Sequence, residues 1–412
     1  MTARITFHEK NRYVGGVIQD TSGTHKTPST SQYLQCSEVT AEPNRETTEI
    51  AFLGDALSRE SYAFQKDVTA DLKLVTIPTV LGALSSTNTI NNAPRSQFFQ
   101  TCGANITVLA AAKYGYVQYG VIMDNITASE DKLSLDYRMA SSEDTVNDKL
   151  FEYTDCQGTV DFEIKTGEYP KLTFNFKGNM ETDSPKTSPK VEVNFGTQSL
   201  LMLQSLREAT LVTATVTPIT PIQGITKVAT AATVTAYGHG LTTADSVYIS
   251  GITGADGALY NGQFTVTVVD VNTFTYTMAG TPTADATGRG IVENTPDAST
   301  ICFDSLTATN FFGFDYQRIL TSCEAGWSKG PIPSDVTMTI LEEQVGGTSF
   351  NPDANLEKFF AVKVKWGAGA GRYMTLKWNK LQVVSAKEAK IGTRMARDTT
   401  FKNTGNSFII FE

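Results

Sequence analysis

The stretch GTVDFEIKTGEYPKLTFNFKG, from Gly158 to Gly178, carries the clearest structural signal in the chain. Apolar residues alternate with polar ones on both sides of a turn that contains Gly167. The apolar positions are Val160, Phe162, Ile164, Leu172, Phe174 and Phe176. This alternation predicts two amphipathic strands, and the glycine-bearing turn between them predicts a β-hairpin. Each strand then presents one face to a core and one polar face elsewhere, as in a β sandwich or barrel.

The rest of the chain is also rich in strand signals. It has 412 residues, 40% of them hydrophobic and 19% charged, which fits two or three domains with real cores. Residues 68–74 alternate in the same way as the hairpin strands. Two helices are predicted. One spans 94–102, with Pro94 in its first turn and Gly103 just past its end, and the other spans 198–209, with leucines along one stripe.

The composition changes at Pro218-Ile219-Thr220-Pro221. From there to about Val292 the chain is rich in Thr, Val and Gly, and short strand patterns at 232–237, 246–249, 263–269 and 273–278 are separated by turn signals. Because proline-rich boundaries often separate domains, we expect residues 218–292 to form an inserted small β barrel or Ig-like domain. The host domain is then discontinuous, comprising residues 1–217 and 293–412.

Two motifs of the host resemble those of bacteriophage tail tube proteins, the major tail proteins. The hairpin is similar to their "G-T-[VF]-x-F … G-E-x-P-x-L-x-F-x-F-x-G" pattern. Upstream, Ala93-Pro94 followed by residues 98–103 resembles their "A-P … L-L-x-A-C-G" helix. The resemblance covers residues 30–195. It implies a mainly β fold, a tail-tube-type sandwich or barrel with a flanking short helix. It also implies homohexameric rings that stack into a tube for genome ejection.

The predicted insert resembles a small β module of phage structural proteins, whose pattern is likened to the first catalytic-cysteine half-domain of ubiquitin-activating enzymes. Residues 236–241, 247–251, 261–264 and 272–276 carry this likeness. The insert contains no cysteine, so thioester chemistry does not carry over. We interpret it as a decoration on the exterior of the tube.

Bulk properties exclude several classes of function. The net charge is −9, which argues against binding of nucleic acid through phosphate neutralisation. The N-terminus lacks the pattern of a secretory signal, and no run approaches the ~20 apolar residues of a membrane helix. The five cysteines are widely spaced without a C-x-x-C, so we interpret them as reduced and mostly buried. We expect a virion protein made in the host cytoplasm, without a membrane anchor.

No pattern indicates catalysis, a cofactor or a metal. The three histidines, His8, His25 and His239, lie in polar or Gly-flanked segments. The Gly367–Arg372 stretch lacks the third glycine of a dinucleotide loop and lies between two strand patterns, which indicates a hairpin loop. The sequence gives no reason to place any two of the carboxylates Glu163, Glu168, Glu342 and Glu343 around a sugar, as a glycosidase site requires. We expect a non-enzymatic structural protein.

Two sets of residues are candidates for function. The segment 54–66 is a long loop with apolar residues, and the resemblance implies that it packs against the neighbouring ring. Its contact residues are Leu57, Arg59, Glu60, Tyr62, Phe64 and Lys66. The polar face of the hairpin is a candidate for the channel wall, past which double-stranded DNA moves without specific binding. Its residues are Asp161, Glu163, Lys165, Lys171, Thr173 and Asn175. We expect acidic neighbours that make the wall net negative.

Two other functional classes stay open. A baseplate, fibre or receptor- and glycan-binding virion protein would carry trimer-forming repeats or an exposed aromatic platform. A polysaccharide-degrading enzyme would carry clustered acids on a β-helix repeat. Neither pattern is found in the sequence.

Overall fold

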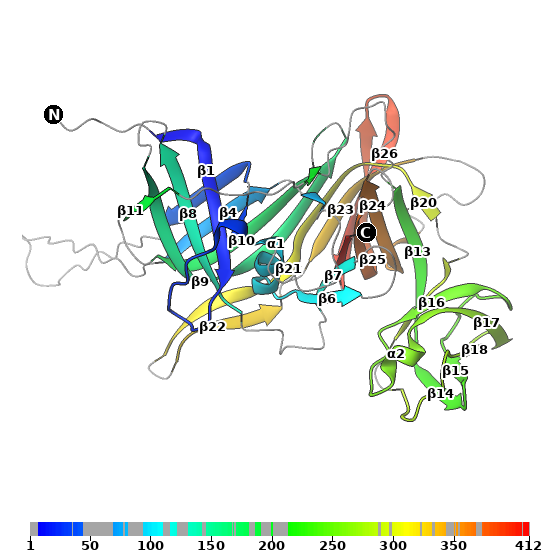
Figure 1. Cartoon of the computed structure of the whole chain (residues 1–412). Coiled ribbons are helices and arrows are strands. Elements are labelled where there is room, and N and C mark those ends of the chain that lie inside the picture. Colours follow the sequence, from blue (N-terminus) through cyan, green and yellow to red (C-terminus); the bar gives the residue numbers. More distant parts are fainter. Residues whose placement is uncertain are drawn as a thin grey trace, which may run out of the picture.

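A computed structural model describes residues 7–34, 36–43, 69–76, 79–80, 94–109, 116–121, 131–141, 146–166, 168, 170–180, 186–190, 199–200, 213–286, 290–295, 299–321, 324–331, 334–342, 350, 352, 355–367, 373–405 and 407–411. These residues are mainly β, in antiparallel pairings, as the composition predicted (Figure 1). No helix within these ranges is both long and apolar enough to cross a membrane.

The hairpin predicted from Gly158–Gly178 is confirmed. Strands β9 (Asn147–Lys165) and β10 (Lys171–Met180) are antiparallel, with Glu163 opposite Lys171 and Gly158 opposite Phe176. A Cβ atom at position 158 would lie 1.8 Å from the carbonyl oxygen of Asn175. The two backbones therefore approach so closely at this point that only glycine fits.

The hairpin belongs to a first set of seven paired strands in the order β2-β1-β8-β9-β10-β4-β3. The strands not yet bounded are β1 (Phe7–Ile18), β2 (Tyr33–Leu34), β3 (Glu38–Pro43), β4 (Thr69–Thr76) and β8 (Leu133–Ser141). A short strand, β11 (Lys186–Pro189), pairs with the start of β9.

A second set of strands follows in the order β20-β13-β24-β25-β26-β23-β21. Their bounds are β13 (Thr213–Pro221), β20 (Ser299–Ile301), β21 (Phe303–Thr321), β23 (Asp335–Leu341), β24 (Phe359–Gly367), β25 (Tyr373–Ile391) and β26 (Arg394–Asn403). Strand β21 also pairs with the end of β9, which joins the two sets into one sheet.

Shorter elements complete the host. Strand β27 (Ser407–Phe411) pairs with the start of β25, and the hairpin of β6 (Asn105–Leu109) and β7 (Tyr116–Val121) extends from β27. Strand β22 (Glu324–Pro331) folds back on the second part of β21. Strands β5 (Thr79–Val80) and β12 (Ser199–Leu200) pair with each other, and a 3-10 turn spans Thr30–Gln32.

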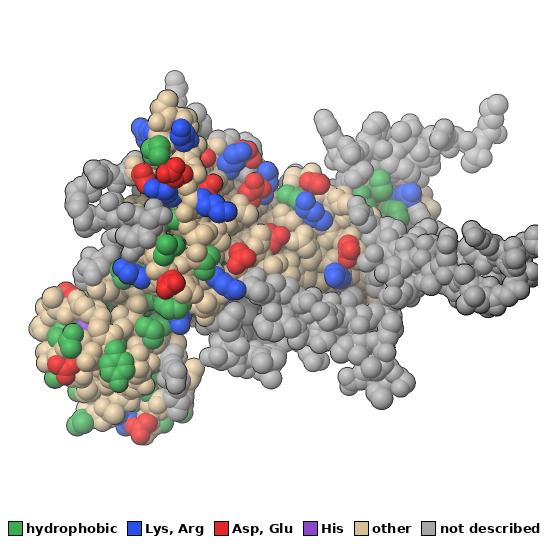
Figure 2. Space-filling model, turned by 180° about the vertical axis from the view of Figure 1, so that it is seen from behind, with side chains coloured by type: hydrophobic (Ala, Val, Ile, Leu, Met, Phe, Trp, Pro, Cys, Tyr) green, Lys and Arg blue, Asp and Glu red, His purple; other side chains and the backbone are tan. Residues whose placement is uncertain are grey.

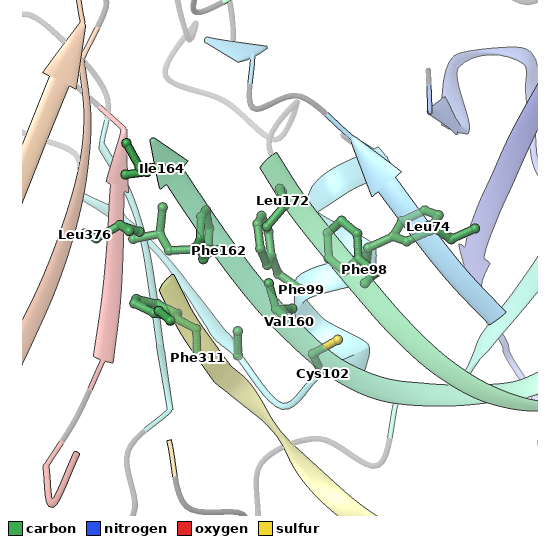
Figure 3. Close-up of a cluster of buried hydrophobic side chains, with 14 of the residues drawn as sticks. Leu74, Phe98, Phe99, Cys102, Val160, Phe162, Ile164, Leu172, Phe311 and Leu376 are labelled. Atoms are coloured by element: carbon green, nitrogen blue, oxygen red, sulfur yellow. The ribbon is translucent and has the colours of Figure 1, made fainter. Parts of the chain in front are cut away.

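Helix α1 (Pro94–Thr101) confirms the predicted helix, and Gly103 follows it with φ +83°. Its residues Phe98 and Phe99 are fully buried, and the ring centroids of Phe98 and Phe174 are 5.4 Å apart. Figure 3 shows both rings and Cys102 packed beside strands β9 and β10. The helix therefore packs on the apolar face of the first set of strands, and the same buried cluster continues into the second set.

The helix predicted over 198–209 is wrong at its start. Ser199 and Leu200 lie in strand β12, paired with Val80 and Thr79, and residues 201–212 lie outside the described residues. The stripe of leucines has the spacing of a helix, but pairing with a distant strand decides the structure of its first residues.

Residues 222–292 contain a second buried apolar cluster, separate from that of the host. The strands predicted there are confirmed as β15 (Ala231–Thr235), β16 (Ser246–Ser250), β17 (Gly262–Asp270) and β18 (Thr273–Thr277). The structure adds β14 (Gly224–Val228), α2 (Gly257–Tyr260) and β19 (Ile291–Glu293). Figure 1 shows these elements grouped to one side of the host sheet. Whether residues 218–292 fold independently stays a prediction.

Strand β13 connects the two parts. Residues Thr213–Pro218 pair with β24, whereas Ile219–Pro221 pair with β19, so the change of partner coincides with the first proline of the boundary. At the same place the backbone N–H of Asn294 donates to the carbonyl oxygen of Pro218 at 2.9 Å. The chain thus leaves and re-enters the host at neighbouring points.

Candidate functional site: the polar face of the hairpin

The six hairpin residues predicted as a channel wall lie on one face of the sheet. They alternate with Phe162, Ile164 and Phe174, which are buried against the core. Glu163 and Lys165 are exposed, and the other four positions, Asp161, Lys171, Thr173 and Asn175, are half-buried. Register brings Asp161 opposite Thr173 and Glu163 opposite Lys171. The structure therefore brings the predicted residues together.

The charged groups on this face are paired with one another. The Lys171 ammonium lies 3.2 Å from a carboxylate oxygen of Glu168 and 3.5 Å from one of Glu163, and Lys165 lies 3.1 Å from the other oxygen of Glu168. Hydrogen bonds from Lys165 and Lys171 lower the pKa of Glu168, and the bond to Glu168 raises the pKa of Lys171. Both lysines are therefore neutralised locally by carboxylates of the same turn.

Asp161 has a structural role within the face. Its carboxylate accepts a hydrogen bond from the side-chain amide of Asn175 at 2.7 Å and another from the backbone N–H of Asn310 at 2.7 Å. Asn310 has φ +51° and lies in a bulge of β21, between its two runs of pairing with β9. Asp161 therefore holds the irregular part of β21 against the hairpin.

The polar face continues across the neighbouring strands. Register aligns Lys165, Ser305, Thr339, Asp398 and Lys387 in one row across β9, β21, β23, β26 and β25. Ser305 donates to the Thr339 hydroxyl at 3.0 Å, and Thr339 donates to Asp398 at 2.7 Å. The row of polar side chains thus crosses the joint between the two sets of strands, and its hydrogen bonds link the three members on β21, β23 and β26.

Acidic and basic side chains both occur along this face. Among them are Asp71, Asp161, Glu163, Glu168, Asp335 and Asp398, and Lys73, Lys165, Lys171, Lys177, Lys387 and Lys402. A net negative wall stays a prediction. On the surface seen in Figure 2, acidic and basic side chains are likewise interspersed.

The predicted inter-ring residues Leu57, Arg59, Glu60, Tyr62, Phe64 and Lys66 lie outside the described residues. The predicted hairpin around Gly367–Arg372 is confirmed at its base, where Gly367 pairs with Tyr373, and residues 368–372 lie outside the described part.

The two histidines whose side chains are described have structural contacts. The Leu241 N–H donates to Nδ1 of His239 at 3.0 Å, so Nε2 carries the proton and donates to the Asp270 carbonyl at 3.0 Å. His25 Nε2 lies 2.9 Å from buried Asp136. Within the described ranges, no group of three or more His, Cys, Asp or Glu side chains has the arrangement of a metal site. Cys102 and Cys156 are buried, whereas Cys36 is half-buried and Cys302 is exposed.

A buried polar cluster was missed by the sequence analysis. Arg138 donates to the Tyr33 hydroxyl at 2.9 Å, to Asp136 at 3.4 Å, and to the Pro189 carbonyl at 3.1 Å. Tyr33 also donates to Asp136 at 3.3 Å. Burial raises the pKa of Tyr33 well above its usual value. These contacts tie β2, β8 and β11 together, which assigns the cluster a structural role.

Comparison with known proteins gives no family assignment. No family model matches the chain, and no curated protein matches it. The functional interpretation therefore depends on the chain itself.

Proposed function

We propose that this protein is the tail tube subunit of a long-tailed bacteriophage, a structural virion protein that assembles into stacked rings around a channel for the genome. The observation that carries the proposal is the β9–β10 hairpin, whose sequence resembles the tail tube motif and whose polar face continues over the adjoining strands. The alternative is another virion β protein, such as a baseplate, fibre or glycan-binding component.

A sheet with two different faces suits the wall of a channel. One face buries Val160, Phe162 and Phe174 in the core, and the other presents hydroxyls, amides and paired charges. When such sheets are placed side by side around an axis, their polar faces line a water-filled passage while their cores remain covered. The wall needs no catalytic group, cofactor or metal.

The pairing of charges suits the passage of DNA. Each lysine that neutralises a phosphate releases counterions and adds affinity. Lys165 and Lys171 are already paired with Glu163 and Glu168, so phosphate binding would have to displace a carboxylate. We therefore propose that the lysines of the wall are neutralised by carboxylates of the same face, so that the wall retains DNA weakly.

Electron microscopy of the purified chain tests the assembly. Stacked rings or tubes with an open channel are expected. Elongated trimers without a channel would favour a fibre or baseplate component, and particles that stay compact at high concentration would contradict the tube.

Cysteine accessibility tests which face lines the channel. In a Cys302→Ser background, Glu163→Cys places a thiol on the polar face, and Thr226→Cys places a matched thiol on the exposed surface of the 222–292 region. In free subunits both thiols should react with a small and with a bulky maleimide. In tubes, the thiol at position 163 should react only with the small maleimide, whereas the thiol at position 226 should react with both. Equal bulky labelling of both sites in tubes would overturn the placement of the hairpin.

A further inference from the structure

The two sets of strands repeat one topology. We call β1, β2, β3, β4, β8, β9, β10 and β11 the first unit, and β13, β20, β21, β23, β24, β25, β26 and β27 the second unit. When the intervening strands β5–β7, β12, β14–β19 and β22 are set aside, the strands of one unit match those of the other one for one in chain order. Their spatial order also matches: β2-β1-β8-β9-β10-β4-β3 against β20-β13-β24-β25-β26-β23-β21, with β11 and β27 each beside the start of the long central strand.

The hairpins at the centre of the units also share their register. Strand β8 begins at Leu133 and its equivalent β24 at Phe359. The separation between these two starts equals that between the starts of β9 at Asn147 and of its equivalent β25 at Tyr373. Tyr137 pairs with Phe151 as Lys363 pairs with Lys377.

The irregularity in these hairpins is repeated as well. Beyond a register shift, Leu133 pairs with Cys156 as Phe359 pairs with Gln382. Because bulges are specific features of a fold and are not random defects, this agreement indicates that the units are structural repeats of each other.

The repeat shows how one unit joins the next. Inside the chain, the edge strand of the second unit, β21, pairs with the end of β9 in the first unit, with Ser305 opposite Lys165 and Thr307 opposite Glu163. The equivalent elements are β3 and the end of β25. Within the described residues, β3 pairs only with β4, and residues 384–391 pair only with β26. Each chain thus makes this joint once internally, between β21 and β9. It also carries the two equivalent strands, β3 and the end of β25, that are needed to make the same joint with another copy.

We propose that β3 of one copy pairs antiparallel with residues 384–391 of a second copy, in the way that β21 pairs with β9 inside each chain. Unpaired strand edges favour such addition of a strand, and Val384, at the start of the free edge of β25, has a side chain that is 47% exposed. The contact is head-to-tail, so it generates a closed ring or an open helix.

The register of the proposed joint follows from the repeat. Thr173 lies opposite Asp161 and Val75, and Asp398 lies opposite Lys387 and Thr339. Position 75 is therefore equivalent to 339, which makes Glu38 equivalent to Ser305 and Thr40 equivalent to Thr307. Because Thr307 faces Glu163, Thr40 is expected to face Ala389 of the second copy.

The joint between copies is weaker than the internal one. Phe162 and Ile164 are buried at the internal joint, whereas Glu388 and Lys390 are exposed at the equivalent positions of β25. The inter-copy joint buries less apolar surface and depends more on backbone hydrogen bonds. Free subunits can therefore remain apart until assembly.

The inference also predicts the number of chains in a ring, and this part of it rests on the proposed function. Each chain supplies two equivalent units, so a ring built with this joint contains half as many chains as units. If the six positions that the resemblance implies are filled by units, the ring contains three chains.

Disulfide trapping tests the joint. In a Cys302→Ser background, chains with Thr40→Cys are mixed with chains with Ala389→Cys under oxidising conditions that allow assembly. Covalent dimers are expected from the mixture and not from either variant alone. The matched positive control is Thr307→Cys with Glu163→Cys in one chain, which should close an internal disulfide. Thr40→Cys mixed with Thr226→Cys should give no dimer. Absence of the 40–389 dimer in assembled material, with the internal control closed, overturns the joint.

The mass of the ring gives an independent measurement that needs no cysteine variant. Native mass spectrometry of rings from the unmodified chain should give three chains, and six chains would overturn the inference while leaving the tube function in place. Conversely, covalent head-to-tail dimers from a chain that forms no tube would retain the joint and remove the proposed function.

Discussion

The Asp161 carboxylate accepts the backbone N–H of Asn310 at 2.7 Å, across the joint between strands β9 and β21. The two residues are far apart in the chain, and the contact joins the two units of the fold. Its partner on the other side is the amide of Asn175 at 2.7 Å.

Replacing Asp161 with alanine should therefore destabilise the protein. The change leaves the Asn310 N–H without its acceptor at a bulge, and it removes a second hydrogen bond. We expect a loss of about 1–3 kcal/mol in the free energy of unfolding, measured by urea denaturation. Glu163→Ala, two residues away on the same face and exposed, is the matched control and should change stability by about 0.5 kcal/mol or less. Equal effects of the two variants would contradict this role of Asp161.

Asp155 supports an irregular point of β9. Its φ is +52°, and its carboxylate accepts bonds from the Ser22 hydroxyl at 3.0 Å, the Gly23 N–H at 2.9 Å and the Asn179 amide at 3.2 Å. Asp155→Ala should cost about 1–3 kcal/mol, because it removes all three bonds and alanine tolerates this φ poorly.

Two variants at position 155 separate the causes. Asp155→Gly restores conformational freedom without the bonds, and Asp155→Asn keeps the carbonyl acceptor and the tolerance for positive φ. Thermal melts should rank Asn above Gly and Gly above Ala in stability. A glycine variant as stable as the wild type would show that the hydrogen bonds contribute nothing.

The buried tyrosines predict a loss of stability at alkaline pH. Burial raises the pKa values of Tyr13 and Tyr33 well above the usual value of about 10. The folded state then holds the phenolic protons more tightly than the unfolded chain. Stability is fully present below pH ~10 and falls above it, by up to ~1.4 kcal/mol per pH unit for each such group.

Denaturant midpoints measured from pH 8 to the alkaline limit check this dependence. Tyr33→Phe removes one of the contributing hydroxyls, so its stability should fall less steeply with pH than that of the wild type. Its stability at neutral pH should be lower by about 1–3 kcal/mol, because Arg138 and Asp136 lose a buried partner. Identical slopes for variant and wild type would contradict the assignment.

Deleting residues 218–292 tests their independence from the host. Their apolar residues pack in a separate cluster, and Asn294 hydrogen-bonds to Pro218, so a short Gly/Ser linker can close the gap. The host should stay soluble and keep a cooperative melt. A modest loss is expected because the deletion removes the Tyr248 ring that Lys377 contacts.

Lys377→Ala in the full chain measures that lost contact and is the matched control for the deletion. An insoluble deletion variant, or one without a cooperative transition, would show that residues 218–292 are part of the host core. In that case the boundary at Pro218 would not separate two folding units.

The elements that were predicted correctly depend on local signals. The β9–β10 hairpin follows from alternation around a glycine turn, and α1 follows from Pro94 and Gly103 at its ends. The polar face of the hairpin was predicted for the same reason, because alternate residues of a strand point to opposite faces. The segment 198–209 had a local helical signal as well, but Ser199 and Leu200 pair with β5, so a distant contact decided their structure.

The sequence by itself thus determined the mainly β class, the central hairpin and the identity of its polar face. Only the tertiary structure decided which polar residues are buried: Asp136 and Arg138 occupy strand positions typical of a solvent face, yet Tyr33 and the segment at Pro189 cover them. Only the tertiary structure showed the repeat of the two units, because equivalent positions carry dissimilar side chains. Phe162 and Ile164, for example, correspond to Glu388 and Lys390. Register and backbone pairing are shared between the units where side chains are not, and register depends on which strands meet in space.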